Sequence, residues 1–253
     1  MLPNDNSTEQ DSWEFLRKHT AARIALGHSG VSLPTKELLA FRLAHAQARD
    51  AVYSELAIGK ISAQLSFNGL DYLTIKSSAV SRNEYLKNPN SGRRLDNESI
   101  QKVKRLSSSY DLCFIIGDGL SATAVNKHAV ELVKILISKS KKSNWSIAPV
   151  VLVEQARVAI SDEIGYLIKA EIIVMFIGER PGLSSPDSMG AYITYHPELG
   201  LTDERRNCVS NIRPEGLSYI FAAEKIFYLL TEMKIRQLSG VQLKDRQDDL
   251  LLE

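Results

Sequence analysis

The C-terminal half of the chain contains three short, continuous apolar runs that are rich in β-branched residues. They read DLCFIIGDG over residues 111–119, WSIAPVVLVEQARV over 145–158 and EIIVMFIGERPG over 171–182. A strand that is apolar on both faces has to be covered on both faces, which is typical of parallel sheets with helices on either side. The runs therefore predict the central strands of a parallel sheet.

Helical patterns separate these runs. Apolar residues recur at helical spacing in 121–142 and 161–170, and a longer helical pattern covers 218–238. The segment AYITYHP, at 191–197, indicates a further strand. Strands that alternate with helices predict an α/β fold. We expect a Rossmann-like, mostly parallel sheet domain preceded by a small helical N-terminal domain.

The N-terminal third has a different pattern. Residues 35–57 carry apolar side chains at helical spacing, with Thr35 expected as the N-cap of a helix. Residues 60–105 mix short apolar pairs with Asn, Ser and Gly, which predicts a loop-rich connector. Within it, SGRRLDNES is the best domain boundary, because Asp96 or Asn97 can cap a following helix. The expected division is a flexible N-terminus (1–11), a helical region with its connector (12–95) and the α/β domain (96–253).

Composition excludes several classes of protein. The apolar content is 44%, the charged content is 24% and the formal net charge is +1, without a long basic run. A nucleic-acid binder needs a stronger positive field, so we expect no nucleic-acid partner. No apolar run approaches the length of a membrane span. The two cysteines, Cys113 and Cys208, are far apart and form no CxxC motif, so we expect no disulfide framework, no metal site and a cytoplasmic location.

Loops at the carboxyl ends of the predicted strands are the expected ligand-binding region, because ligands bind at this edge of open α/β sheets. Three such loops can be identified: GDGLSAT (117–123), EQARVAISDE (154–163) and GERPGLSSPDS (178–188). GDGLSAT lacks the last glycine of GxGxxG and also fails GxSxG. It is either an ordinary strand-to-helix turn with Ser121 as cap, or the phosphate-binding turn of a nucleotide-cofactor enzyme, with Glu154 as a poor ribose acceptor.

The other two loops also have a structural and a functional interpretation. SDEIG predicts a helix capped by Ser161, with Asp162 and Glu163 complementing the helix dipole. Glu179 ends an apolar strand, where an unpaired carboxylate is costly. It either pairs with Arg180 or accepts hydrogen bonds from a ligand. Histidines and carboxylates form no acid/base constellation in the sequence.

Five motifs occur together in a fixed order: LPTKELLAFRLAHAQARDAV, DGLSATAV, QARVAISDEIG, IGERPGLSSPDSMGAY and DERRNCVSNIRPEGLSY. In this combination, over about residues 12 to 238, the chain resembles the small-subunit family of ethanolamine ammonia-lyase. The resemblance implies an enzyme that uses adenosylcobalamin to convert ethanolamine to acetaldehyde and ammonia by radical chemistry. It also implies a large subunit that holds the substrate and the radical-handling residues, so that this chain has no catalytic residue of its own.

The resemblance further implies where the cofactor contacts fall. Val158 would offer its backbone carbonyl, Glu179 its carboxylate and Cys208 a contact from the adjoining loop, which makes residues 96–253 a cobalamin-contacting domain. The sequence contains no D-x-H-x-x-G pattern, so the resemblance implies that cobalamin keeps its own benzimidazole on cobalt. GDGLS is expected to face the nucleotide tail.

Location and the rival functions stay open at this point. Some members of the family carry a long N-terminal extension that directs them into a bacterial microcompartment, and only about a dozen residues precede the matching region here. Cytoplasm or microcompartment is therefore an open choice. Two other functions compete with the cofactor-site subunit: a purely structural assembly subunit, and a stand-alone enzyme with a nucleotide cofactor.

Overall fold

The computed structural model describes residues 11–106 and 108–246, and all structural statements below refer to these residues. The strands are β1 (Tyr72–Lys76), β2 (Tyr110–Gly117), β3 (Val150–Glu154), β4 (Ala170–Gly178), β5 (Met189–Tyr195) and β6 (Asn207–Ile212). The α-helices are α1 (Thr35–Tyr53), α2 (Ile58–Phe67), α3 (Arg82–Lys87), α4 (Asn97–Arg105), α5 (Ala122–Lys142), α6 (Ile160–Ile168) and α7 (Tyr219–Arg236). Of the predicted flexible N-terminus, all but Asp11 lies outside the described residues.

The strands form a six-stranded sheet in the order β1-β3-β2-β4-β5-β6. Strands β1, β3, β2 and β4 run parallel to one another, whereas β5 is antiparallel to β4 and β6 is antiparallel to β5. The predicted α/β fold with a mostly parallel sheet and an N-terminal helical region is confirmed. All three apolar runs form strands, β2, β3 and β4, and these lie side by side in the centre of the sheet.

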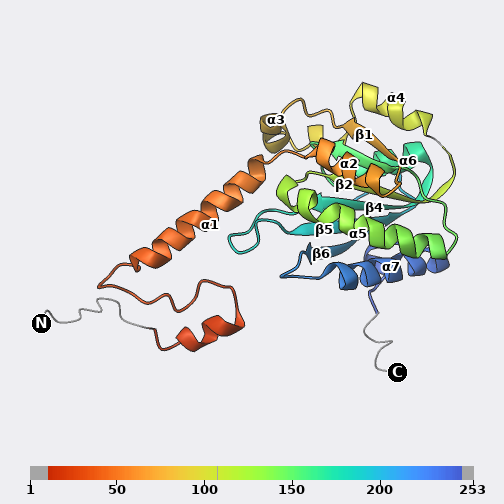
Figure 1. The fold of residues 1–253 in the computed structure, drawn as a ribbon. Coiled ribbons are helices and arrows are strands. Elements are labelled where there is room, and N and C mark those ends of the chain that lie inside the picture. Colours follow the sequence, from red (N-terminus) through yellow and green to blue (C-terminus); the bar gives the residue numbers. More distant parts are fainter. Residues whose placement is uncertain (1–10, 107, 247–253) are drawn as a thin grey trace, which may run out of the picture.

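Helices cover the sheet on both faces (Figure 1). Helices α2, α5 and α7 pack over one apolar face, to which Phe114 and Phe176 contribute stacked rings with centroids 6.1 Å apart. Helices α4 and α6 cover the other face around Ile115 and Met175. Alternate residues of β2 and β4 point to opposite faces of the sheet, so the side chains on both faces of each strand are buried. This explains why their sequences are continuously apolar.

The prediction of a loop-rich connector over residues 60–105 is wrong. This segment contains α3, α4, most of α2 and the edge strand β1, which pairs with β3 from Tyr72 to Lys76. The sequence YLTIK is short and half exposed, so its pattern does not stand out from the flanking polar residues. A boundary between residues 95 and 96 would separate β1 from the sheet to which it is hydrogen-bonded.

Helix caps test the local predictions. Ser121 caps α5, and Asp96 caps α4 by accepting a hydrogen bond of 2.7 Å from the Ser99 backbone N–H, so both predictions are confirmed. Thr35 is not a cap, because Pro34 occupies that position and its carbonyl accepts the first hydrogen bonds of α1. Thr35 is the first residue inside the helix.

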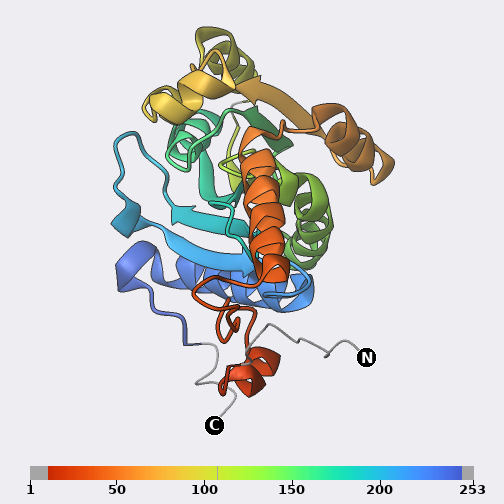
Figure 2. The ribbon, with the colours of Figure 1, turned by 90° about the vertical axis from the view of Figure 1, so that its left-hand side faces the viewer.

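The N-terminal arm, residues 11–53, extends away from the sheet (Figures 1 and 2). It leaves the body near the edge at which β2 and β4 end, since the Thr123 N–H at the start of α5 donates to Ser54 Oγ just after α1. Only the small side chains of Ala44 and Ala51 are buried on α1. Its large apolar side chains, including Leu39 and Leu43, are exposed to solvent.

Candidate functional site

Strands β5 and β6 have one face that is open around Tyr192 and Cys208. Ala191, Ile193 and Val209 point into the core under α7, and because side chains alternate along a strand, their neighbours point to the opposite face. That face carries the half-buried Tyr192 and the exposed Cys208, which are directly paired between the two strands. Helices α4 and α6 lie over the parallel strands instead. The β5–β6 ribbon therefore presents a sheet surface that a ligand or a partner can cover.

A pocket of about 440 Å³ lies beside this open face. It is formed where the loop after β3 and α6 meet the loop before α4, strand β5 and the segment before β6. Its lining residues are Pro89, Arg93, Arg157, Val158, Ala159, Tyr192, Leu201, Thr202 and Asp203. The predicted contact residue Val158 thus lines a cavity at the carboxyl end of β3.

Glu179 follows β4 directly and is half buried. Its Oε2 accepts hydrogen bonds from the Ser188 hydroxyl and, at 3.2 Å, from the Asn211 backbone N–H. The alternative in which Arg180 neutralises this carboxylate is wrong, because Arg180 is exposed and forms no ion pair within the described chain. No hydrogen bond between described residues reaches Glu179 Oε1, so one carboxylate oxygen remains available as an acceptor.

Tyr192 connects the three predicted contact residues and was not identified from the sequence. It shares the pocket with Val158 and lies opposite Cys208 in the β5–β6 pair, and the charge of Glu179 affects its pKa. Burial, with smaller contributions from Cys208 and Glu179, raises the pKa of Tyr192 to about 12. The alternation in AYITY is the one signal that could have separated Tyr192 from its inward-facing neighbours.

Cys208 is exposed on the open face, with its Sγ 3.5 Å from the Ser210 hydroxyl. Partial desolvation by the surrounding protein raises the pKa of its thiol above the ordinary value, and Glu179 contributes to this increase. The sulfur is therefore a neutral thiol at physiological pH. Such a group can pack against an apolar surface or donate a weak hydrogen bond.

The Val158 carbonyl already has internal partners. It accepts hydrogen bonds from the Ser161 backbone N–H at 3.1 Å and from the Ser161 hydroxyl at 2.7 Å. The prediction that Ser161 caps α6 is wrong, because Ala159 is the N-cap and Ser161 lies inside the first turn. A ligand donor that uses this carbonyl has to compete with the Ser161 hydroxyl, since a carbonyl oxygen offers two lone pairs.

Asp162 and Glu163 lie in the first turn of α6, as predicted, and each also makes a specific contact. Asp162 is buried in an ion pair with Arg206, and Arg206 also bonds to Asp203 at 2.8 Å. Burial raises the pKa of Asp162 to about 6, while the Arg206 guanidinium acts in the opposite direction. Glu163 accepts the Leu95 backbone N–H at 2.9 Å. Arg206 thereby fixes the segment before β6 to α6 at the edge of the pocket.

The turn GDGLSAT (117–123) packs closely against the loops that follow β3 and β4. The buried Asp118 carboxylate accepts from the backbone N–H groups of Gly119, Gln155 and Ala156. A Cβ atom at Gly119 would lie 2.3 Å from the Gly178 carbonyl oxygen, and the Leu120 N–H donates to that oxygen at 2.9 Å. The glycines of this turn thus allow close packing of the loops that follow β2 and β4. They leave no phosphate cradle, so the nucleotide-cofactor interpretation of this turn is not supported.

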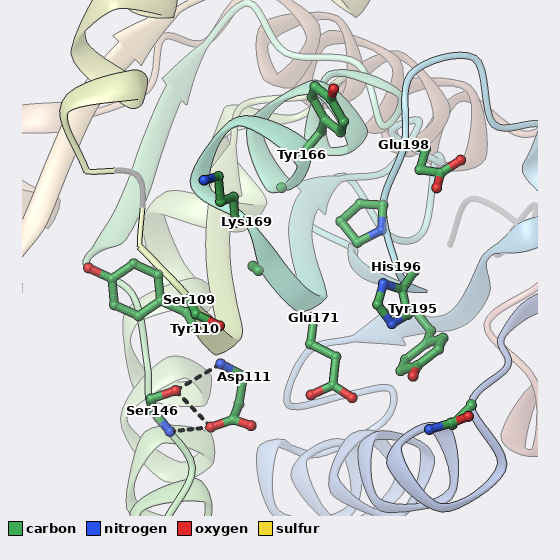
Figure 3. Close-up of a pocket in the computed structure, with 14 residues that line it drawn as sticks. Ser109, Tyr110, Asp111, Ser146, Tyr166, Lys169, Glu171, Tyr195, His196 and Glu198 are labelled. Carbon is green, nitrogen blue, oxygen red and sulfur yellow. Dashed lines mark hydrogen bonds between the residues drawn. The ribbon is translucent and has the colours of Figure 1, made fainter.

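A larger cavity, of about 650 Å³, lies at the opposite edge of the sheet (Figure 3). It surrounds the amino ends of β2 and β4 and the carboxyl end of β5, and includes Asp111, Glu171 and His196. Lys234 pairs with both of these carboxylates, and Asp111 also accepts from Ser146. None of the predicted contact residues lines this cavity. Asp111 and Glu171 are already paired with Lys234, so we place the candidate site at the smaller pocket.

Two further kinds of site are absent from the described residues. They contain no group of three or more His, Cys, Asp or Glu side chains arranged to hold a metal ion. None of the described helices has the length and apolarity needed to cross a lipid bilayer.

Fold and site together define an α/β protein with a mostly parallel sheet and a polar pocket beside the open face of two added antiparallel strands. The family model described as ethanolamine ammonia-lyase light chain (EutC) matches residues 10–244. The chain belongs to the ethanolamine ammonia-lyase light-chain family.

Curated relatives agree over nearly their whole length. The chain is 51% identical to the ethanolamine ammonia-lyase small subunit of Pseudomonas fluorescens strain Pf0-1 over 248 residues, covering 96% of this chain and 90% of the relative. It is 49% identical to that of Pseudomonas syringae pv. tomato, covering 95% and 85%. For the small subunit of Pseudomonas aeruginosa strain UCBPP-PA14 the identity is also 49%, covering 98% and 92%.

Proposed function

We propose that this chain completes an adenosylcobalamin site at its interface with the large subunit of ethanolamine ammonia-lyase. The observation that carries the proposal is the open β5–β6 face, where Cys208 and the free Oε1 of Glu179 adjoin the pocket that contains Val158. Cobalamin is rimmed by amide side chains whose N–H groups need acceptors. A carboxylate oxygen without an internal partner fits that chemistry.

The residues of this chain have binding and positioning roles in the proposal. The cofactor supplies the radical chemistry of the reaction when it is bound. Glu179 accepts an amide N–H through Oε1, while Ser188 and Asn211 hold its other oxygen and so fix its orientation. Cys208 packs as a neutral thiol against the ligand. The Val158 carbonyl can accept a ligand donor once the Ser161 hydroxyl, which now donates to it, rotates away.

The proposed partner is the large subunit, and the exposed arm supports it. Leu39 and Leu43 are 57% and 62% exposed and lie one helical turn apart, so they form an apolar stripe along α1. A helix with so little buried surface gains little of the packing that stabilises helices in proteins. Because the arm extends from the same edge of the sheet as the proposed cofactor site (Figure 1), one partner can cover both.

A cytoplasmic location is part of the proposal and agrees with two free cysteines.

Substitution of Glu179 by Gln tests the site directly. Loss of a charge-assisted hydrogen bond should weaken adenosylcobalamin binding to the assembled complex by roughly ten- to a hundredfold, equivalent to about 1.5–3 kcal/mol. Affinity is measured from the visible absorption of the cofactor. Glu198→Gln, an exposed glutamate at the opposite edge of the sheet, is the matched control and should change nothing.

The rival function, a purely structural assembly subunit, makes the opposite prediction. If Glu179→Gln changes the affinity by less than about twofold, the assignment of Glu179 fails and the structural role is favoured. Titrations with this chain alone, with the large subunit alone and with the mixture complete the test, followed by ammonia release from ethanolamine. Cofactor binding and turnover by the large subunit alone would make this chain an accessory.

A further inference from the structure

Two arginines of the candidate pocket have no carboxylate partner. Arg157 and Arg93 both line the cavity, and neither has an acidic side chain within ion-pair distance among residues 11–106 and 108–246. The carboxylate that lines the same cavity, Asp203, is bound to Arg206. Arg157 is half buried, whereas Arg93 is exposed. The half-buried positive charge of Arg157 is unfavourable without a counter-charge unless a ligand supplies one. The pocket is therefore suited to an anion.

Arg157 is held rigidly for such a role. Its guanidinium carbon lies 4.2 Å from the ring centroid of the fully buried Tyr85, and its Nη2 donates to the Tyr85 carbonyl at 3.1 Å. Its backbone N–H donates to the Gly92 carbonyl at 2.7 Å. A Cβ at Gly92 would lie 2.8 Å from the Arg157 Cγ, so only glycine leaves space for this stem. Nε is buried without a hydrogen-bond partner, and no hydrogen bond between described residues uses Nη1, so Nη1 remains available to a ligand.

Unlike Arg82, which contacts the same tyrosine ring, Arg157 lacks a carboxylate partner. Both guanidinium groups lie close to the Tyr85 ring, with Arg82 at 4.6 Å from its centroid. Arg82 has a counter-charge, because its Nη1 lies 3.3 Å from Asp118 Oδ2. Arg157 has none, and the ring cannot provide one, since burial raises the pKa of Tyr85 to about 12 and keeps it a neutral phenol. Of two equivalent cation–π contacts, the one that faces the pocket is left unpaired.

We infer that Arg157, together with Arg93 in the same pocket, binds the phosphodiester group of the cofactor's nucleotide tail. This inference rests on the proposed function and specifies which part of the cofactor the pocket receives. A planar guanidinium recognises phosphate oxygens through paired N–H donors. In this arrangement Glu179 binds the amide rim of the corrin, whereas Arg157 binds the tail. The two contacts are therefore separable with a ligand that has the rim but lacks the tail.

Adenosylcobinamide is that ligand, because it retains the corrin amides and lacks the nucleotide tail. We would titrate the complex of both subunits with adenosylcobalamin and adenosylcobinamide and follow the visible absorption. Arg157→Gln should weaken adenosylcobalamin binding by roughly tenfold or more and change adenosylcobinamide binding by less than about twofold. Arg93→Gln should act in the same direction. Arg94→Gln, at an exposed arginine outside the pocket, is the matched control.

Two further measurements distinguish loss of the tail contact from misfolding and from binding of a different anion. Arg157→Lys keeps the charge and should fall between wild type and Arg157→Gln for adenosylcobalamin alone. An excess of inorganic phosphate should weaken adenosylcobalamin binding in the wild type and have no effect on adenosylcobinamide. If phosphate binds through Arg157 while the affinity for either corrinoid is the same in wild type and Arg157→Gln, the ligand is free phosphate and the inference is overturned.

The remaining outcomes separate this inference from the proposed function. An equal loss for both corrinoids in Arg157→Gln and Arg157→Lys would overturn the inference, since a tail contact cannot affect a ligand without a tail. Glu179→Gln should weaken both corrinoids. If Glu179→Gln weakens both and Arg157→Gln weakens neither, the cofactor site stands and the tail contact fails. If Glu179→Gln weakens neither, the proposed function fails.

Discussion

His128 is a buried histidine on α5 whose environment opposes protonation. Its side chain is 5% exposed, and its Nδ1 lies 2.6 Å from the Tyr219 hydroxyl. Burial lowers the pKa of His128 below its ordinary value near 6.5, and nearby Asp187 offsets this only in part. The unfolded chain therefore binds a proton more readily than the folded protein does. The contribution to stability is complete above about pH 6.5 and is lost as the pH falls through the folded-state pKa.

Replacing His128 by Gln should remove this pH dependence. We expect the free energy of unfolding of the wild type to decrease relative to that of His128→Gln between about pH 7.5 and about pH 5.5. Urea unfolding at several pH values measures the difference. His45→Gln, at an exposed histidine of α1, is the control and should follow the wild type. Parallel curves for wild type and His128→Gln would contradict the prediction.

Residue contacts could be predicted from sequence only where the partner is a near neighbour in the chain. The caps formed by Ser121 and Asp96 were predictable because each bonds to a backbone N–H three residues later. The donors to Glu179 come from Ser188 and Asn211, which reach it through the strand pairing. Arg180 is adjacent in sequence and does not take part. Sequence patterns carry no signal for such long-range hydrogen bonds.

The loops after β2 and β4 form one interlocked unit. Ser121 Oγ donates to the Pro186 carbonyl at 2.8 Å, and Lys127 pairs with Asp187 at 2.7 Å. At their centre, a Cβ atom at Gly178 would lie 2.0 Å from the Ser121 carbonyl oxygen. The contact is between backbones, so no side-chain rearrangement can relieve it. The loop that carries Glu179 is thus fixed to the N-terminus of α5.

Gly178→Ala should separate these loops. We expect a loss of about 3 kcal/mol in the free energy of unfolding, at the upper end of the usual cost of overpacking. Gly59→Ala is the control, because Gly59 lies in α2 and a Cβ atom at this position would have nothing within 4 Å. It should stabilise the protein by about 0.5–1 kcal/mol through helix propensity. A similar effect of both substitutions on chemical unfolding would contradict the interlocked arrangement.

Elements were predictable where both faces are buried and were missed where they are not. Strands β2 and β4 have continuous apolar sequences because helices cover both of their faces. Strand β1 lies at the edge and only Ile75 is buried, so its pattern is no stronger than that of a loop. What places β1 in the sheet is its pairing with β3, a contact across more than seventy residues of chain.

The whole molecule consists of a packed α/β body and an arm whose helix α1 contributes no residue to the core of the body (Figure 1). Leu39→Gln combined with Leu43→Gln should weaken assembly with the large subunit by roughly a hundredfold or more, since the two leucines together lose about 3–6 kcal/mol of burial. The stability of the isolated chain should change by less than about 0.5 kcal/mol per site. Sedimentation of the mixed subunits measures the first effect, and urea unfolding the second.

Arg42→Gln, at an exposed polar position of the same helix, is the control for the arm. If the double variant assembles normally, α1 is not the docking element. If it instead abolishes self-association of this chain, the arm binds a second copy. At this scale the sequence could predict the α/β body and helix α1. It could not show that Leu39 and Leu43 face solvent, because helical spacing predicts an apolar stripe without saying whether this chain or another protein packs against it.

Arg82 links that arm to the pocket. Its Nε donates to the Val52 carbonyl in the last turn of α1 at 2.7 Å, and its Nη1 bonds to Asp118, which in turn holds the backbone of Gln155 and Ala156. The next residue is Arg157. A partner that fixes α1 therefore also limits the positions open to the pocket loop. Thermodynamic linkage makes such coupling reciprocal, so the cofactor should tighten subunit assembly by the same factor by which assembly tightens cofactor binding.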